Sequence, residues 1–211
     1  MAETFDIAII GGGIVGASLA HALGGRRSVV LLEQEDFCGY HATGRSAAEF
    51  TRRFHSDGAG RLTGASAGFL LAPPDGFCDT ALLRPRGNLV VADKEKADHL
   101  KQTFAQETTR DAGAAHPIEM QSVTQALARV PFLDPDWLGA AFYDPECWDV
   151  EVETLLQSYL KSARKGGADI RQGAQVSHRH PMMGYQPKRW RSAIVSAITW
   201  RRSVPAWGTP S

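Results

Sequence analysis

The chain has 211 residues, of which 43% are hydrophobic and 22% are charged. This ordinary composition excludes a wholly disordered or fibrous protein, and the length is enough for one substantial domain. Basic and acidic residues both number 23, so the net charge is zero and indicates no particular partner. The charge is uneven along the chain, because residues 170–211 contain seven basic residues and no acidic one.

The N-terminal 33 residues have the order strand, tight turn, helix, strand. Residues 5–10 (FDIAII) form a short apolar run that predicts a strand, and GGGIVG and an alanine-rich helix follow. In this G-x-G-x-x-G pattern, Gly11 permits the turn, Gly13 lets the backbone approach a pyrophosphate, and Gly16 lets the helix pack on the strand. The N-terminus of the helix then attracts phosphate groups.

A second apolar run, residues 27–32 (RSVVLL), ends in Glu33, which lies 22 residues after Gly11. An acidic residue at this strand end accepts hydrogen bonds from the ribose hydroxyls of an adenosine and repels a 2′-phosphate, which disfavours NADP. The combined pattern predicts a dinucleotide-binding βαβ unit in an α/β fold. FAD and NAD both remain possible cofactors from this pattern alone.

A polar loop, GYHATGRSAAE, follows at residues 39–49. Ser46 and Glu49 have the S-x-x-E spacing of a capping box, so we predict a second helix that begins at Ala47. The free N–H groups of that helix could hold a second part of a long flavin-bearing cofactor. An ordinary capped helix without a ligand is the alternative interpretation.

The GYHATGRSAA loop after a G-x-G-x-x-G unit resembles the FAD-dependent oxidoreductases of the D-amino-acid oxidase and dehydrogenase family, and most of all the D-arginine dehydrogenase type. Residues 73–93 and 138–170 are similar as well, and the resemblance covers about residues 5–176. It implies FAD, a Rossmann-like FAD-binding unit and part of an inserted α+β substrate domain. It also implies oxidation of a D-amino acid or related amine to an imino acid and then a 2-oxo acid, with hydride transfer to the flavin. The electron acceptor and the oligomeric state stay open.

The resemblance also implies which residues contact the cofactor. Around the pyrophosphate it places Gly11, Gly13, Val15 and Gly16. At the adenosine it places Glu33, Gln34 and Val176. Along the pyrophosphate, the ribityl chain and the flavin it places the loop residues Ala42, Thr43, Gly44, Arg45, Ser46, Ala47, Ala48 and Glu49.

Three positions on the substrate side differ from relatives that act on basic D-amino acids. Glu49 stands where those relatives have histidine, Phe54 where they have tyrosine, and Asn88 where they have an acid. An acidic side chain would pair with a guanidinium, and neutral Asn88 cannot do so. The sequence therefore argues against D-arginine as the substrate, and it assigns no catalytic residue. Glu49 either meets a substrate amine or is only the capping-box acid.

The remaining patterns predict the domain organisation. We expect an FAD-binding unit with the flavin loop at 1–88, a partial substrate domain at 89–150, a return helix and strand at 151–176, and a basic tail at 177–211. Apolar periodicity predicts strands at 89–92, 138–143 and 169–171, and helices at 94–112, 122–129 and 152–165.

Three cysteines, Cys38, Cys78 and Cys147, show no CxxC or zinc spacing. We therefore expect free thiols in a reducing, cytoplasmic compartment and no metal site. Residues 7–25 carry no Asp, Glu, Lys or Arg, but their six glycines fit a tight turn better than a membrane span, so we expect no span.

The basic tail at 177–211 lies beyond the resemblance. Out-of-frame translation is the explanation we favour, because Arg exceeds Lys by 17 to 6, as in GC-rich coding. A basic aromatic tail for nucleic acid or an acidic membrane, and a short variant that docks on a partner subunit, are the alternatives. We expect no nucleic-acid partner. The chain would then be an enzyme impaired by truncation, a non-catalytic FAD-binding fragment or a basic-tailed interaction module.

Overall fold

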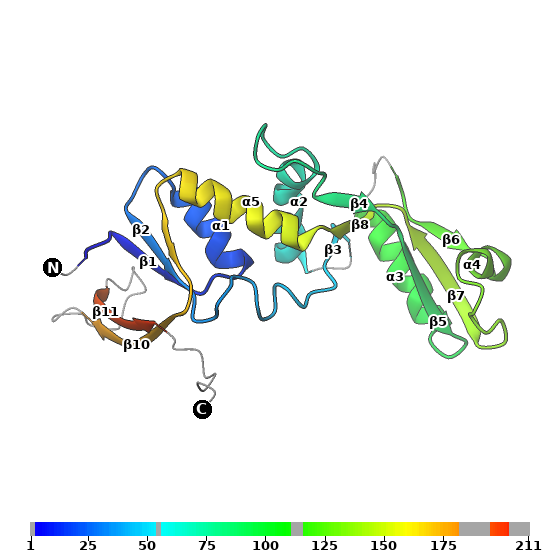
Figure 1. Cartoon of the computed structure of the whole chain (residues 1–211). Coiled ribbons are helices and arrows are strands. Elements are labelled where there is room, and N and C mark those ends of the chain that lie inside the picture. Colours follow the sequence, from blue (N-terminus) through cyan, green and yellow to red (C-terminus); the bar gives the residue numbers. More distant parts are fainter. Residues whose placement is uncertain (1–2, 54–55, 111–115, 182–194, 203–211) are drawn as a thin grey trace, which may run out of the picture. The chain divides into compact units, whose positions relative to one another are not determined.

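The computed structural model describes residues 3–53, 56–110, 116–181 and 195–202, and the chain divides into two compact units (Figure 1). The first unit combines Met1–Ser46 with Val152–Ser211, and the second is Ala47–Glu151. Residues 47–88 therefore lie in the second unit, although the sequence pattern placed them with the cofactor unit. The reason is strand pairing, because β3 (Glu49–Thr51) pairs with β8 (Cys147–Val150).

The first unit is built on a parallel sheet with the strand order β1-β2-β9. An antiparallel pair, β10-β11, follows the sheet in the chain. The elements are β1 (Ile7–Ile10), α1 (Ile14–Leu23), β2 (Val29–Leu32), α5 (Val152–Lys165), β9 (Asp169–Arg171), β10 (Ala174–Pro181) and β11 (Val195–Arg202). The predicted α/β fold with a parallel βαβ unit is confirmed.

Strand β2 forms the centre of the first unit. All four of its residues are buried, and they alternate between two faces. Leu31 packs among the residues of α1 and α5, whereas Val30 and Leu32 pack against Ala174 of β10. A strand covered on both faces explains why the run VVLL is apolar throughout rather than alternating.

Helices α1 and α5 lie side by side against the sheet (Figure 1). Small residues make this approach possible: Ala17 and Ala20 of α1 are fully buried. Just beyond the ends of α1 and α5, a side chain on Gly166 would place its Cβ 2.8 Å from the Cα of Gly24. The close packing of the two helices therefore depends on the absence of side chains at this point.

The second unit contains two antiparallel sheets, with strand orders β3-β8-β4 and β5-β7-β6. Its other elements are α2 (Asp57–Leu71), β4 (Leu83–Pro85), β5 (Asn88–Asp93), α3 (Ala97–Arg110), β6 (Glu119–Gln121), α4 (Val123–Arg129) and β7 (Leu138–Asp144). Helix α3 packs on one face of β7, where Leu100 meets Phe142, and α4 packs on the other, where Ala126 meets Ala141.

The predicted helix at Ala47 is absent from the structure. Residues Glu49–Thr51 form β3 instead, and Phe50 is 5% exposed beside Trp148 of β8. Burial of an aromatic side chain in a strand pair contributes more than a capping box, which stabilises a helix end by about 1 kcal/mol. The S-x-x-E pattern at Ser46 was therefore a wrong signal.

Helix α2, which the sequence pattern did not predict, begins ten residues later. Its N-cap is Ser56, whose hydroxyl accepts the N–H of Ala59 at 3.5 Å. Four glycines within the helix lower its intrinsic propensity and hide it from a pattern search. Among the described residues, no helix is long and apolar enough to cross a membrane.

Candidate functional site

The turn between β1 and α1 requires glycine at two positions. Gly11 has φ +101°, a conformation that side-chain-bearing residues rarely adopt. A Cβ on Gly16 would lie 2.0 Å from the carbonyl oxygen of Gly11, so the helix could not start so close to the strand. The chain thereby brings the first turn of α1 close to the end of β1.

Glu33 follows β2 and is 7% exposed. Its carboxylate accepts two backbone N–H groups, from Gly12 at 2.6 Å and from Glu35 at 3.0 Å. The first of these hydrogen bonds joins Glu33 to the glycine turn, 21 residues earlier in the chain. The carboxylate is therefore held in one orientation by backbone donors beside the start of α1.

The loop after Cys38 folds back onto the same turn. The N–H of Gly44 donates to the carbonyl of Gly39 at 2.7 Å, which closes the loop, and the Thr43 hydroxyl accepts the N–H of Ile14 at 3.1 Å. Gly13, the N-cap residue of α1, has no side chain of its own, so Thr43 satisfies an N–H group at the helix N-terminus from a distant part of the sequence.

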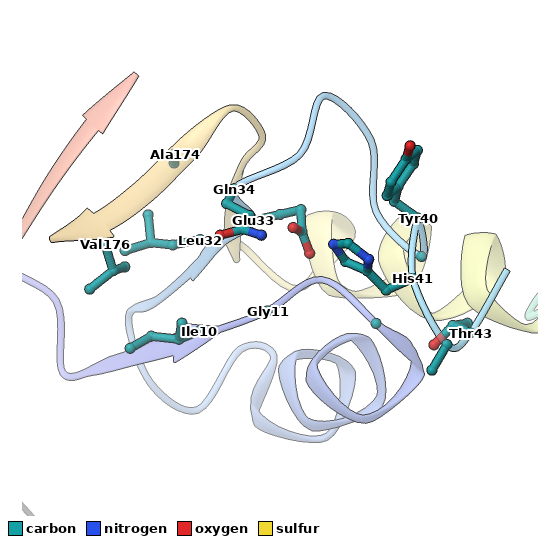
Figure 2. Close-up of a pocket in the computed structure, with 13 residues that line it drawn as sticks. Ile10, Gly11, Leu32, Glu33, Gln34, Tyr40, His41, Thr43, Ala174 and Val176 are labelled. Atoms are coloured by element: carbon teal, nitrogen blue, oxygen red, sulfur yellow. The ribbon is translucent and has the colours of Figure 1, made fainter. Parts of the chain in front are cut away.

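These segments line an open cavity of about 370 Å³ within the first unit (Figure 2). Seven of the predicted cofactor residues line it: Gly11, Gly13, Glu33, Gln34, Ala42, Thr43 and Val176. Six further lining residues had no predicted contact with the cofactor: Ile10, Leu32, Gly39, Tyr40, His41 and Ala174. Their position beside predicted residues in the same strands and loop was the signal that could have identified them.

Eight predicted cofactor residues lie outside the cavity lining. Val15 is 77% exposed on α1, and Gly16 is buried behind the turn. The others follow Thr43 in the chain, and the last three of them belong to the second unit: Gly44, Arg45, Ser46, Ala47, Ala48 and Glu49.

Two of the predicted substrate-side residues, Glu49 and Asn88, are described, and both belong to the second unit. Glu49 pairs with the guanidinium of Arg86, which also pairs with Asp149 at 3.0 Å and contacts the Sγ of Cys147 at 3.3 Å. Neither the capping-box role nor a free carboxylate is therefore seen at Glu49. Asn88 is the first residue of β5, and Phe54 lies outside the described residues.

The chemistry of the cavity fits a dinucleotide. Ile10, Leu32 and Val176 give it apolar walls, and Glu33 offers a fixed carboxylate that can accept hydroxyl groups. Gly13 leaves room at the helix N-terminus, where a Cβ would lie 3.1 Å from the Thr43 hydroxyl. Apolar walls for a base, a carboxylate for a ribose and a helix N-terminus for phosphates meet in one cavity.

Comparison with known proteins identifies the family. The family model described as DAO, FAD dependent oxidoreductase, matches residues 6–197. This chain belongs to the DAO family of FAD-dependent oxidoreductases. The expectation of FAD is thus confirmed at the level of the family, and the matched range extends past Ser177, where the resemblance seen in the sequence ended.

The relatives of this DAO-family chain are named for different substrates and reactions. The FAD-dependent oxidoreductase domain-containing protein 1 homolog of Drosophila melanogaster is 28% identical over 179 residues. Among solved structures, L-α-glycerophosphate oxidase from Mycoplasma pneumoniae with FAD bound has a TM-score of 0.72 at 16% identity. Glycine oxidase from Geobacillus kaustophilus has a TM-score of 0.68 at 24% identity. L-amino acid deaminase from Proteus myxofaciens, in complex with anthranilate, has a TM-score of 0.72 at 19% identity.

These matches cover most of this chain but only part of each relative. The Drosophila alignment covers 81% of this chain and 34% of the relative. The alignments with the three structures, in the order given above, cover 86%, 82% and 96% of this chain. They cover 48%, 47% and 44% of the respective solved chains. The chain thus spans about a third of the curated relative and just under half of the solved structures. At these identities the structures establish the shared fold.

Proposed function

We propose that the cavity of the first unit binds the adenosine and pyrophosphate of FAD, and that the protein oxidises a D-amino acid or related amine. The product would be an imino acid, which water converts to a 2-oxo acid. The observation that carries this proposal is one cavity lined by the glycine turn, the fixed Glu33 carboxylate and Thr43. Membership of the DAO family supports the cofactor, and relatives named for amino acids support the substrate class.

The residues of the cavity would bind FAD through groups that are already in place. An ionised carboxylate has about four lone-pair sites. Gly12 and Glu35 use two of those at Glu33, so others remain for the ribose hydroxyls. The positive end of the α1 dipole, which begins beside Gly13, would attract the pyrophosphate.

FAD, when bound, supplies the chemistry of the reaction by accepting a hydride from the substrate, and the protein holds the substrate and excludes side reactions. Glu49, Phe54 and Asn88 remain the proposed substrate-side residues. The Glu49 carboxylate is shared with Arg86, so a substrate amine would compete with that guanidinium. This competition favours a neutral or weakly basic substrate side chain over arginine.

The cofactor proposal is tested by titrating FAD into the full chain, checked by intact mass, and following the visible spectrum and the flavin fluorescence. Gly13→Val places a side chain in the space beside Thr43, so we expect its FAD affinity to fall at least about tenfold. Gly64→Val is the matched control, because beyond its chain neighbours and the backbone of α2 itself no atom lies within 4 Å of the Cβ position at Gly64. A folded chain that binds no FAD, or equal affinity in both variants, would contradict the proposal.

The substrate proposal is tested by mixing the FAD-loaded chain, without oxygen, with D-amino acids, their L enantiomers and glycine. Loss of the oxidised flavin bands with D-amino acids alone supports it, and reduction by the L enantiomers or glycine alone contradicts it. Bound FAD that no amine reduces would favour the non-catalytic FAD-binding fragment. Salt-dependent binding of nucleic acid without FAD would favour the basic-tailed interaction module.

A further inference from the structure

His41 lines the cavity but had no predicted role. Its side chain is 60% exposed, and its Nε2 lies 2.9 Å from Oε1 of Glu35. In Figure 2 the imidazole lies between the Glu33 carboxylate and Thr43, that is, between the carboxylate proposed for the ribose and the residue that caps α1. The ring therefore borders the part of the cavity where a pyrophosphate would follow a ribose.

The cavity offers little positive charge to balance the negative charges of a dinucleotide. Among its thirteen described lining residues, Glu33 is the one acidic residue and His41 the one residue that can carry a positive charge. FAD brings two further negative charges on its pyrophosphate. The helix N-terminus offsets only about half an elementary charge. A cationic His41 would supply the missing compensation.

Glu35 determines how the imidazole can act. Its carboxylate accepts from Gln34 at 3.0 Å and lies within hydrogen-bond distance of His41 Nε2, while its own N–H is held by Glu33. If Nε2 carries the proton that Glu35 accepts, the neutral ring presents a lone pair at Nδ1, which repels phosphate oxygens. Only the doubly protonated ring donates from both nitrogens. Donation to Glu35 and to a phosphate at the same time therefore requires a bound proton.

We propose that His41, oriented by Glu35, is the cationic partner of the FAD pyrophosphate, and that FAD binding takes up a proton at this ring. The inference rests on the proposed FAD site and deepens it. The Glu33 carboxylate also faces the ring in Figure 2, and the Tyr40 ring centroid is 5.0 Å away. The Arg45 guanidinium lies over Tyr40, 5.1 Å from its ring centroid. Because donation to Glu35 and to a phosphate at the same time requires a doubly protonated ring, the imidazole is the group that couples binding to pH.

The experiment measures FAD affinity of the full chain by quenching of flavin fluorescence at about pH 6 and about pH 8. These two pH values bracket the ordinary pKa of an imidazole and lie above the ordinary pKa of a carboxyl group. We expect the wild-type chain to lose about fivefold in affinity between these values. His41→Gln should bind FAD about fivefold more weakly at the lower pH and show no dependence on pH. His41→Lys, which keeps a positive charge across the window, should hold the wild-type low-pH affinity at both values. ADP-ribose, whose pyrophosphate is a diester as in FAD and keeps its charge across this window, should compete with FAD in the same pattern.

His99→Gln is the matched control, since His99 is exposed on α3 of the second unit and should leave the wild-type profile unchanged. A His41→Gln profile that keeps the wild-type pH dependence would overturn the inference and leave the FAD site standing. An equal loss of affinity at both pH values would assign the ring a packing role and would also overturn it. If His41→Gln fails to fold, a His41→Lys chain with the full wild-type pH dependence overturns it instead. No binding of FAD by the folded wild-type chain would contradict the proposed FAD site itself.

Discussion

Gly12 donates its backbone N–H to the Glu33 carboxylate across 2.6 Å, and this hydrogen bond ties the end of β2 to the turn that follows β1. The second carboxylate oxygen accepts the N–H of Glu35 at 3.0 Å. Because both donors belong to the backbone, the carboxylate is oriented by the fold itself rather than by a ligand. The residue proposed to bind the ribose is thus also part of the structure that shapes the cavity.

Replacing Glu33 with alanine should therefore affect both stability and binding. Two N–H groups lose a charged acceptor at a residue that is 7% exposed, so we expect the free energy of unfolding to fall by about 1–3 kcal/mol. FAD affinity should fall by about tenfold or more. Glu33→Gln, which keeps one acceptor oxygen, should lose less stability. Urea unfolding and FAD titration measure the two effects, with exposed Glu119→Gln as the control. Unchanged FAD affinity in a folded Glu33→Ala chain would disprove the ribose role.

Gly16→Ala should disrupt the glycine turn. The new Cβ would lie 2.0 Å from the Gly11 carbonyl oxygen, so the start of α1 must move, at a cost of about 1–3 kcal/mol or more. Gly64→Ala makes the same chemical change in α2, where the new Cβ meets no atom within 4 Å beyond its chain neighbours and the helix's own backbone. It should stabilise that helix by about 0.5–1 kcal/mol. Denaturant unfolding followed by circular dichroism compares the two variants. Equal stability changes would show that the close approach at Gly16 does not constrain the turn.

Asp144→Asn tests a buried ion pair in the second unit. Arg53 and Asp144 pair with side chains only 2% and 0% exposed, and the Arg53 guanidinium also lies 3.6 Å from Glu146. Removing one charge leaves its partner buried, which typically costs about 3–5 kcal/mol, and Glu146 should reduce this cost. Asp98→Asn removes one partner of an exposed pair with Lys101 and should cost no more than about 0.5 kcal/mol. Similar losses in the two variants, measured by urea unfolding, would refute the burial argument.

The buried thiols should react slowly in the folded chain. Burial is the main cause that raises the pKa of Cys38, and likewise of Cys147, where the Arg86 hydrogen bond acts in the opposite direction. The thiolate is the reactive form, so iodoacetamide at mildly alkaline pH should label half-buried Cys78 first and all three cysteines only in denaturant. Timed labelling followed by mass spectrometry measures this order. Rapid labelling of Cys147 in the folded chain would be inconsistent with its burial.

The same two thiols predict how stability changes at alkaline pH. The folded state holds their protons more tightly than the unfolded state does. Their contribution to stability is therefore complete below the ordinary thiol pKa and is lost as the pH rises through the raised values. Urea unfolding across this alkaline range should show a decline that Cys38→Ala and Cys147→Ala each reduce. A decline that neither variant alters would assign it to other groups.

Elements defined by local chemistry could be predicted from the sequence. The helix predicted at 152–165 is α5, Val152–Lys165, because its apolar residues recur at helical spacing and Gly166 and Gly167 end it. Ser122 was likewise the predicted start of a short helix, and it caps α4 with a reciprocal hydrogen bond to Gln125. Both ends of these elements depend on residues within a few positions along the chain.

The serines at 46 and 56 show where such prediction fails. Ser46 has the more complete capping-box pattern, yet Ser56 caps a helix and Ser46 does not. What separates them is the pairing of β3 with β8, almost a hundred residues later, which draws Phe50 into a strand. Pairing between distant strands cannot be recognised from local sequence. It therefore outweighed the capping-box pattern at Ser46 in a way that the sequence did not indicate.

The sequence by itself determined the dinucleotide-binding unit, because its turn, its helix N-terminus and the acidic residue after β2 are each specified by residue types at short spacing. Tertiary structure alone decided that Thr43 caps α1, that Gly12 orients Glu33 and that His41 lines the same cavity. These relationships join segments 20 to 30 residues apart in the chain. They depend on how the loop folds back over the glycine turn, and local propensities carry no information about that path.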